Sequence, residues 1–152
     1  MNESEINSVQ AIVFDYIKKN VLLYDQKKYL LSLIDDLLSS LYKIDVFNRK
    51  LFLLPAEIHR VMPDISDETQ LTKSNMGDYL KVVRESINLV DECDVLVAQN
   101  IPIDDQLNIS NSINKVLGRM VVVKFRTDYS LIAGVVIKVD GVVFDYSVAH
   151  YF

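Results

Sequence analysis

The sequence predicts an α+β protein, in which an N-terminal helical bundle (residues 1–92) is followed by a small β-α-β-β-β domain (residues 93–152). Three observations support this prediction. Apolar residues recur with a helical period over the first ninety positions, and the period becomes strand-like after Cys93. Near the C-terminus, an Asp-Gly pair separates two runs of β-branched residues, which is typical of a β-hairpin.

The N-terminal helices are predicted from amphipathic stripes and from residues that cap helices. Ser4 can cap a first helix, and Asp25 can cap a second that extends from Gln26 to Tyr42. A third helix is expected near Asp45, and Pro55 either kinks it or starts a new one. The wide apolar stripe of the second helix predicts burial by several neighbours, as in a bundle.

A polar segment and one more helix complete the predicted bundle. Residues Asp64 to Asn75 are rich in turn-forming types and predict a loop. The segment from Met76 to Asp91 carries apolar residues at helical spacing and predicts the last helix. The two domains are therefore expected to meet close to Cys93.

The second domain is predicted to begin with a short strand, Val95 to Ala98. A helix follows, with Asp104 and Asp105 in its first turn, where carboxylates complement the helix dipole. Gly118 is placed to end this helix in a left-handed conformation. The segment from Met120 to Phe125 predicts the next strand.

The final two strands form the predicted hairpin. Ile132 to Val139 and Val142 to Phe144 are β-rich, and Asp140-Gly141 suits a type I′ turn, which needs positive φ at both positions. Gly134 falls within the first of these runs, where a glycine usually marks a bulge or a close approach of another backbone segment.

Composition excludes several classes of protein. The chain has 16 basic and 21 acidic residues, and a net charge of −5 without a basic patch argues against a nucleic-acid or anionic-membrane surface. No run of about 18 apolar residues occurs, so no transmembrane helix is expected. The polar, acidic N-terminus resembles neither a signal peptide nor a transit peptide, which favours a bacterial cytoplasmic location. The single Cys93 is expected to be a buried apolar residue.

Catalytic chemistry is not predicted. The sequence has no phosphate-binding glycine loop, and His59 and His150 have no cysteine or carboxylate at metal-ligand spacing. Asp35-Asp36 and Asp104-Asp105 are adjacent on helices, so the members of each pair point in different directions. We therefore expect no catalytic residue, no cofactor and no metal.

The C-terminal segment carries a further pattern. It matches the sequence D-x-S-L-I-G-G-V-V-I, followed after a short turn by V-x-D-G-S-V, with Ala133 and Tyr146 in place of two glycines. This pattern resembles the C-terminal signature of the ATP synthase delta subunit family, which is called oligomycin sensitivity-conferring protein in mitochondria. The signature residues of the hairpin here are Asp128, Ser130, Leu131, Ile132, Gly134, Gly141, Asp145 and Ser147.

The resemblance implies a non-catalytic connector in the peripheral stalk, or stator, of an F-type ATP synthase, a complex that couples proton transport to ATP synthesis. The first domain would bind the catalytic head through its alpha subunits, with the beta subunits as a further contact. The second would bind b-type stalk helices. The protein would lie at the cytoplasmic face of the membrane without inserting into it. The family's bundle usually has six helices, whereas this chain has room for about four or five.

The resemblance also implies a groove between the first and last helices of the bundle, which would take an amphipathic alpha-subunit helix. Ordinary core packing is the alternative role for these positions. The residues expected on the groove faces are Val9, Val13, Tyr16, Tyr79, Val83 and Ile87.

Two other hypotheses remain at this point. One is a free-standing helical-bundle adaptor that carries an unrelated small α/β module. The other is a small α/β enzyme, which the lack of a nucleophile, base or metal constellation disfavours. Co-purification with alpha, beta and gamma subunits would separate the stator connector from the adaptor.

Overall fold

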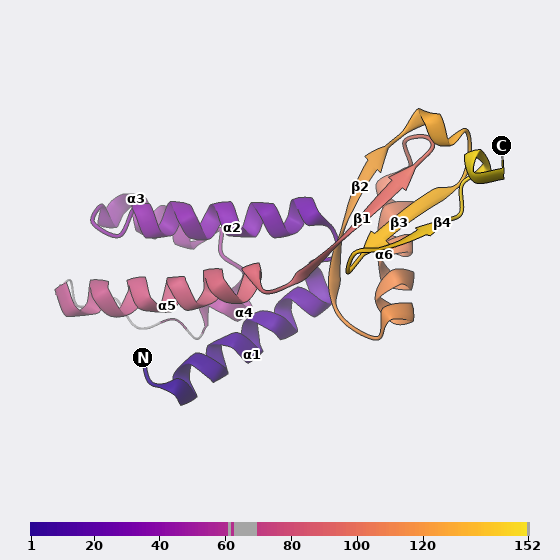
Figure 1. The fold of residues 1–152 in the computed structure, drawn as a ribbon. Helices are drawn as coiled ribbons and strands as arrows, with labels where there is room; N and C mark the ends of the chain where they lie inside the picture. The colour runs from indigo at the N-terminus through magenta and orange to yellow at the C-terminus, as the bar shows by residue number, and fades with distance from the viewer. Residues whose placement is uncertain (61, 63–69, 152) are drawn as a thin grey trace. The chain divides into compact units, whose positions relative to one another are not determined.

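The computed structural model describes residues 1–60, 62 and 70–151. The chain forms two compact units (Figure 1). The helical unit comprises Met1–Asn20 and Lys27–Leu89, and the sheet unit comprises Val21–Gln26 and Val90–Phe152. Helices at the N-terminus are followed by a mixed sheet with one helix, so the predicted α+β class and the β-α-β-β-β order are confirmed.

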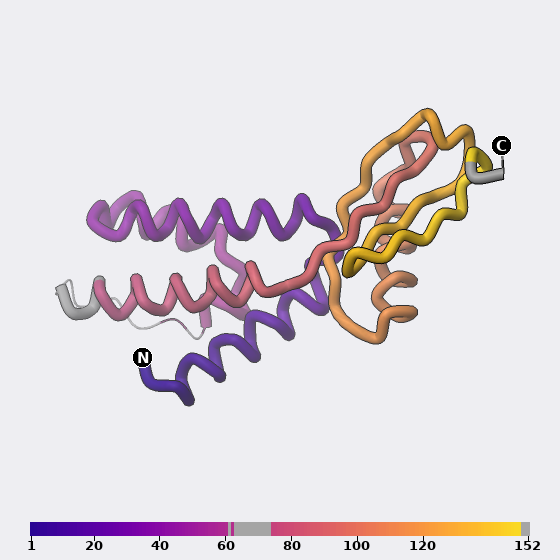
Figure 2. Tube along the Cα trace, in the orientation of Figure 1, coloured from indigo at the N-terminus to yellow at the C-terminus, as the bar shows by residue number. Residues whose placement is uncertain are grey.

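The helical unit is built from α1 (Glu3–Asn20), α2 (Tyr24–Ser39), α3 (Ile44–Leu51), α4 (Ala56–His59) and α5 (Gln70–Asn88). Helix α1 packs against α5 and α4, and Figure 2 shows α1 running obliquely to α5. The apolar stripes predicted for these helices are buried in a shared core. Its fully buried side chains include Val13, Ile17, Ile34, Leu37, Phe47, Ile58, Met76, Tyr79, Leu80, Val83 and Ile87.

The predicted N-terminal caps of the first two helices are wrong. Helix α1 begins one residue before Ser4, and Asn2 caps it: the Glu5 N–H donates to Asn2 Oδ1 at 2.9 Å, and the Asn2 N–H donates to Glu5 Oε2 at 2.9 Å. This reciprocal pair is a capping box. Helix α2 begins at Tyr24, so Asp25 lies in its first turn, and it ends at Ser39. The first error arises because Asn2 and Ser4 are both polar residues that could cap α1, and the second because α2 begins two residues earlier than predicted, directly after Leu23.

Helix α5 is longer at its start than predicted. Of the predicted loop, residues 64–69 lie outside the described part of the chain, whereas Gln70 to Asn75 are helical, which corrects the prediction there. Ser74 and Asn75 are exposed, so their polar character reflects a solvated helix face. The helix ends at Asn88, and Asp91 already belongs to a strand. Pro55 precedes α4, a new helix, which is one of the two predicted outcomes.

The sheet unit contains β1 (Asp91–Val97), α6 (Ile103–Leu117), β2 (Val121–Thr127), β3 (Val135–Val139) and β4 (Val142–Asp145). The strand order is β2-β1-β3-β4. Strands β1 and β2 are parallel and are joined through α6, whereas β3 is antiparallel to both β1 and β4. Short 3₁₀ helices occupy Tyr129–Leu131 and Val148–Tyr151.

Helix α6 lies against one face of the sheet, as Figures 1 and 2 show. Alternate residues of β1 and β2 meet Ile113 on that face, and Cys93 is buried among them as predicted. Gly118 ends α6 with a φ of 64°, which confirms the predicted left-handed cap. The buried residues of this core are Cys93, Val95, Val97, Ile113, Val121, Val123 and Val139.

The strand boundaries differ from the predicted ones. Strand β1 begins at Asp91 rather than Val95, because its first two residues are exposed and polar yet pair with β2. Strand β3 begins at Val135, since Ile132 and Gly134 have φ values of 65° and 92° and cannot continue a strand. The turn itself is as predicted, with Asp140 at 52° and Gly141 at 75°. In the described parts of the chain, no helix is both long and apolar enough to cross a membrane.

Candidate partner-binding surfaces

The helical unit has an open groove between α1 and α5, called here the α1–α5 groove. Its volume is about 660 Å³. Serine and glutamate side chains of α1 form one rim, and Tyr79 of α5 contributes an apolar ring to the floor. The groove is lined by Met1, Ser4, Glu5, Ser8, Val9, Ile12, Met62, Asn75 and Tyr79.

Tyr79 is fixed in place by a buried hydrogen bond. Its hydroxyl donates to the backbone carbonyl of Ile58 at 2.7 Å, so α5 is joined to α4 below the groove. Burial raises the pKa of Tyr79 well above its usual range, because the phenolate would lose its hydration. The hydroxyl therefore stays protonated and keeps donating this bond.

Most of the residues that the sequence placed on groove faces are core residues. Val9, Val13, Tyr79, Val83 and Ile87 are buried where α1 packs against α5. Tyr16 is partly exposed, and burial together with the Glu57 carboxylate raises the pKa of its hydroxyl. Of the six, only Val9 and Tyr79 also line the α1–α5 groove.

Sequence reasoning missed the groove residues next to the buried stripe. Ser8 and Ile12 are one helical turn apart on α1 and border Val9, but neither belongs to the apolar face that the pattern identifies. The signal that could have found them is position on the helix rather than residue type. Flanking positions of a buried stripe lie at the rim, where a partner can reach them.

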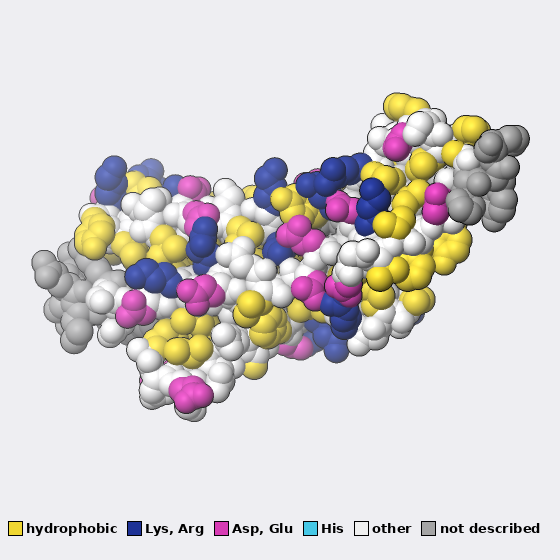
Figure 3. All heavy atoms as spheres, in the orientation of Figure 1, with side chains coloured by type: hydrophobic (Ala, Val, Ile, Leu, Met, Phe, Trp, Pro, Cys, Tyr) yellow, Lys and Arg dark blue, Asp and Glu magenta, His cyan; other side chains and the backbone are white. Residues whose placement is uncertain are grey.

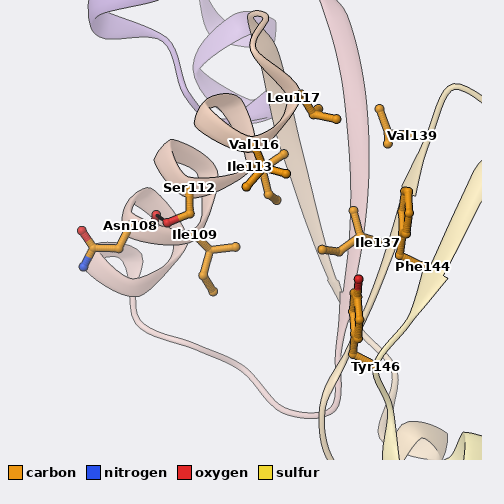
Figure 4. Close-up of a pocket in the computed structure, with 10 residues that line it drawn as sticks. All are labelled: Asn108, Ile109, Ser112, Ile113, Val116, Leu117, Ile137, Val139, Phe144 and Tyr146. Carbon is orange, nitrogen blue, oxygen red and sulfur yellow. Dashed lines mark hydrogen bonds between the residues drawn. The ribbon is translucent and has the colours of Figure 1, made fainter.

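The sheet unit has a second open groove, between α6 and β4, called here the α6–β4 groove. Its volume is about 470 Å³. Figure 4 shows side chains from α6 facing those from the strands across this space. The lining is apolar apart from Asn108 and Ser112. It consists of Asn108, Ile109, Ser112, Ile113, Val116, Leu117, Ile137, Val139, Phe144 and Tyr146.

The α6–β4 groove exists because α6 does not cover the whole sheet. Phe144 stands opposite Ile137 in the β3–β4 pair, and both point to the face that α6 covers only in part. The side chains of Val116, Tyr146 and Phe144 are consequently 85%, 63% and 42% exposed. Figure 3 shows hydrophobic side chains gathered over this region of the sheet unit.

The signature residues build the turns on either side of the hairpin. Asp128 accepts hydrogen bonds from the Ser130 N–H at 3.0 Å and hydroxyl at 2.6 Å, and these bonds lower the pKa of its carboxyl group. Asp145 accepts the equivalent bonds from Ser147 at 2.9 and 2.6 Å. Leu131 is buried, whereas Ile132 is exposed.

Gly134 lies where two backbone segments meet. A Cβ atom at this position would stand 2.3 Å from the Tyr146 carbonyl oxygen and 2.8 Å from Ser147 Cα. The approach confirms that this glycine marks close backbone packing. Tyr146, whose backbone Gly134 approaches, also lines the α6–β4 groove. The hairpin signature therefore shapes one wall of that groove.

Arg119 holds the opposite end of the sheet unit. Its guanidinium bonds to the carboxylates of Asp91 at the start of β1 and Asp140 in the hairpin turn. Both interactions raise the pKa of Arg119, with the Asp140 hydrogen bond contributing most. The Arg119 side chain thereby joins three segments that are distant in sequence. Among the described residues, no cluster of three or more His, Cys, Asp or Glu side chains could hold a metal ion.

Comparison with known proteins places the chain in a family. A model of the family described as ATP synthase delta (OSCP) subunit matches residues 33–151, which is most of the chain. The matched range includes α5, the sheet unit from β1 onward and the whole hairpin signature, but not α1. A comparison with curated proteins yields no match. The chain therefore belongs to the ATP synthase delta (OSCP) subunit family, whose members are non-catalytic peripheral-stalk subunits of ATP synthase.

Proposed function

We propose that this protein is the stator connector of an F-type ATP synthase, which joins the catalytic head to the peripheral stalk and resists the torque of the rotor. Residues 1–92 bind the alpha subunits of the head and also contact its beta subunits. Residues 93–152 bind b-type stalk helices. The protein acts at the cytoplasmic face of the membrane as part of the complex.

The observation that carries the stalk half of the proposal is the α6–β4 groove. The apolar side chains of Val116 and Phe144 are exposed together in this groove, which indicates a surface that a partner covers. The groove is open along its length between a helix and a strand, which suits an amphipathic helix laid beside α6. The uncharged groups of Asn108 and Ser112 can hydrogen-bond to polar side chains at its edge.

The head half of the proposal rests on the α1–α5 groove. It has an apolar floor around Val9 and Tyr79 and a polar rim that includes Glu5 and Ser8. An amphipathic alpha-subunit helix could bury its apolar stripe on this floor and place its polar face against the rim. The buried residues Val13, Val83 and Ile87 would then support the groove by holding α1 against α5, rather than by contact with the partner.

The stalk half is tested by placing a charge in the α6–β4 groove. We expect Val116→Asp to weaken binding to a b-type stalk helix by about 100-fold, because the helix would bury an unpaired carboxylate. The exposure of Val116 means that the fold should tolerate the change. Calorimetric titration of the full-length protein with the stalk helix measures the effect.

A matched control is Asn111→Asp, which adds the same charge to an exposed position of α6 outside the groove lining. We expect this variant to bind the stalk helix like the unsubstituted protein. Equal affinities for the two variants would refute the α6–β4 groove as the stalk site.

The head half is tested with Ser8→Arg, which fills the α1–α5 groove with a long side chain. We expect affinity for the isolated alpha–beta head to fall at least tenfold, because the arginine side chain would occupy space that the partner helix needs. Ala11→Arg is the control, since Ala11 is exposed on α1 outside the groove lining. Surface plasmon resonance with the immobilised head measures both affinities. If Ser8→Arg bound as tightly as Ala11→Arg, the α1–α5 groove would not be the head-binding site.

A further inference from the structure

The connection between α1 and α2 is packed onto the sheet rather than into the helical unit. Residues Val21–Gln26 group with the sheet unit. Leu23 forms a parallel bridge with Val123, and the Val123 N–H donates to the Leu22 carbonyl at 2.9 Å. Val21 and Leu23 are only 5% and 6% exposed. The segment therefore pairs with the outer edge of β2 at Val123, through a parallel bridge of the kind that a neighbouring strand would form.

Side chains from the first turn of α2 hold residues 21–23 against β2. Gln26 Oε1 accepts hydrogen bonds from the N–H groups of Leu22 and Leu23 at 2.9 and 3.0 Å. The Lys124 ammonium lies 4.4 Å from the centroid of the Tyr24 ring, in a cation–π contact between β2 and the first turn of α2. Residues 21–26 are therefore held by a backbone hydrogen bond, by the Gln26 side chain and by the Tyr24 ring.

Chain connectivity gives this arrangement a mechanical consequence. A two-domain chain with one linker crosses between its domains once. Here the chain passes between the units at residues 20–21, 26–27 and 89–90. Segment 21–26 also precedes the range that matches the family model, so the family assignment does not account for it.

We propose that residues 21–23 are a fifth, edge element of the sheet, and that segment 21–26, which also includes the first turn of α2, forms a second tether between the helical unit and the sheet unit. If the stator function proposed above holds, force applied to α1 and α2 reaches the sheet through β2 as well as through the connection from α5 to β1. The tether itself does not depend on that function. Both tests below therefore use the protein without head or stalk.

The first test measures hydrogen exchange at the Val123 amide by NMR, relative to the Val95 amide in the central strand β1. Slow exchange at Val123 is expected, because its N–H is bonded to Leu22. Gln26→Ala should speed Val123 exchange roughly tenfold relative to Val95, because two hydrogen bonds that fix the segment are lost.

The control for exchange is Gln106→Ala, which removes a side-chain hydrogen bond to the Ile101 carbonyl in the same unit, at the start of α6. It should leave the ratio of Val123 to Val95 exchange unchanged. Fast Val123 exchange in the unsubstituted protein, or equal ratios in the two variants, would overturn the proposal.

The second test cuts the other connection. A protease site is inserted between Leu89 and Val90, where Leu89 is exposed, and the full chain is cleaved after folding. The fragments 1–89 and 90–152 should then elute together from a sizing column. With Leu23→Asp, which places a charge at the buried bridge, they should separate. Separation without this substitution, or continued association with it, would show that segment 21–26 is not the tether.

Discussion

Replacing Gly134 with alanine is expected to unfold the sheet unit while the helical unit stays folded. The new Cβ would lie 2.3 Å from the Tyr146 carbonyl oxygen, a backbone atom that cannot rotate away. The Tyr146 N–H donates to the Val135 carbonyl and the Val148 N–H donates to the Ala133 carbonyl, both at 2.9 Å, so the facing segment is held in place. We expect a loss of about 3–5 kcal/mol in the free energy of unfolding of this unit.

Two other glycines provide matched controls. Gly118 and Gly141 also have positive φ, at 64° and 75°, but a Cβ atom at either would meet nothing within 4 Å. Alanine at these positions should therefore cost only the conformational strain of about 1–2 kcal/mol. Urea unfolding followed by circular dichroism and by sheet-unit NMR signals gives the comparison. A loss at Gly134 no greater than that at Gly118 would contradict the close approach of the two backbones.

The Gly134 variant also separates the two proposed binding functions. Tyr146 lines the α6–β4 groove, and its backbone packs against Gly134, so stalk binding should disappear with the sheet unit. The core of the helical unit is formed by its own helices, so head binding should persist. Loss of head binding instead would argue against this division of roles.

Truncation of Tyr79 to alanine is expected to destabilise the helical unit to a comparable degree. Its side chain is only 2% exposed, and removing a buried aromatic ring leaves a cavity at a cost of about 3–5 kcal/mol. Tyr79→Phe retains the ring but leaves the Ile58 carbonyl without the hydroxyl that donates to it at 2.7 Å, at a cost of about 1–2 kcal/mol. Thermal unfolding of both variants tests whether Tyr79→Ala loses more stability than Tyr79→Phe. Equal losses of stability would contradict this expectation.

The same side chain predicts how stability depends on pH. Burial raises the pKa of Tyr79 above its unfolded value of about 10. Its contribution to stability is therefore complete below about pH 10 and is lost as pH rises, because the unfolded chain releases the proton first. Unfolding measured between neutral and alkaline pH should show a smaller alkaline loss in Tyr79→Phe than in the unsubstituted protein. An identical loss in both would exclude Tyr79 as a cause.

Local sequence patterns were enough to predict the fold class and to identify the C-terminal signature. The Asp140-Gly141 turn and the Gly118 cap were predictable because each depends on the φ angles of one or two residues. The order of the sheet unit followed from the change in apolar period after Cys93, since periodicity reports which face of an element is buried. The apolar stripes of the bundle were predictable for the same reason.

Tertiary structure alone decided which residues reach a partner. Ser8 and Ile12 line the α1–α5 groove because they border a stripe whose burial depends on α5. The α6–β4 groove depends on how far α6 extends over the sheet, which no local pattern encodes. Residues 21–23 look like an ordinary interhelical connection in sequence, and only the bridge between Leu23 and Val123 places them beside β2. Contacts between segments distant in sequence are set by packing of the whole chain, whereas turns and caps are set by their own backbone angles.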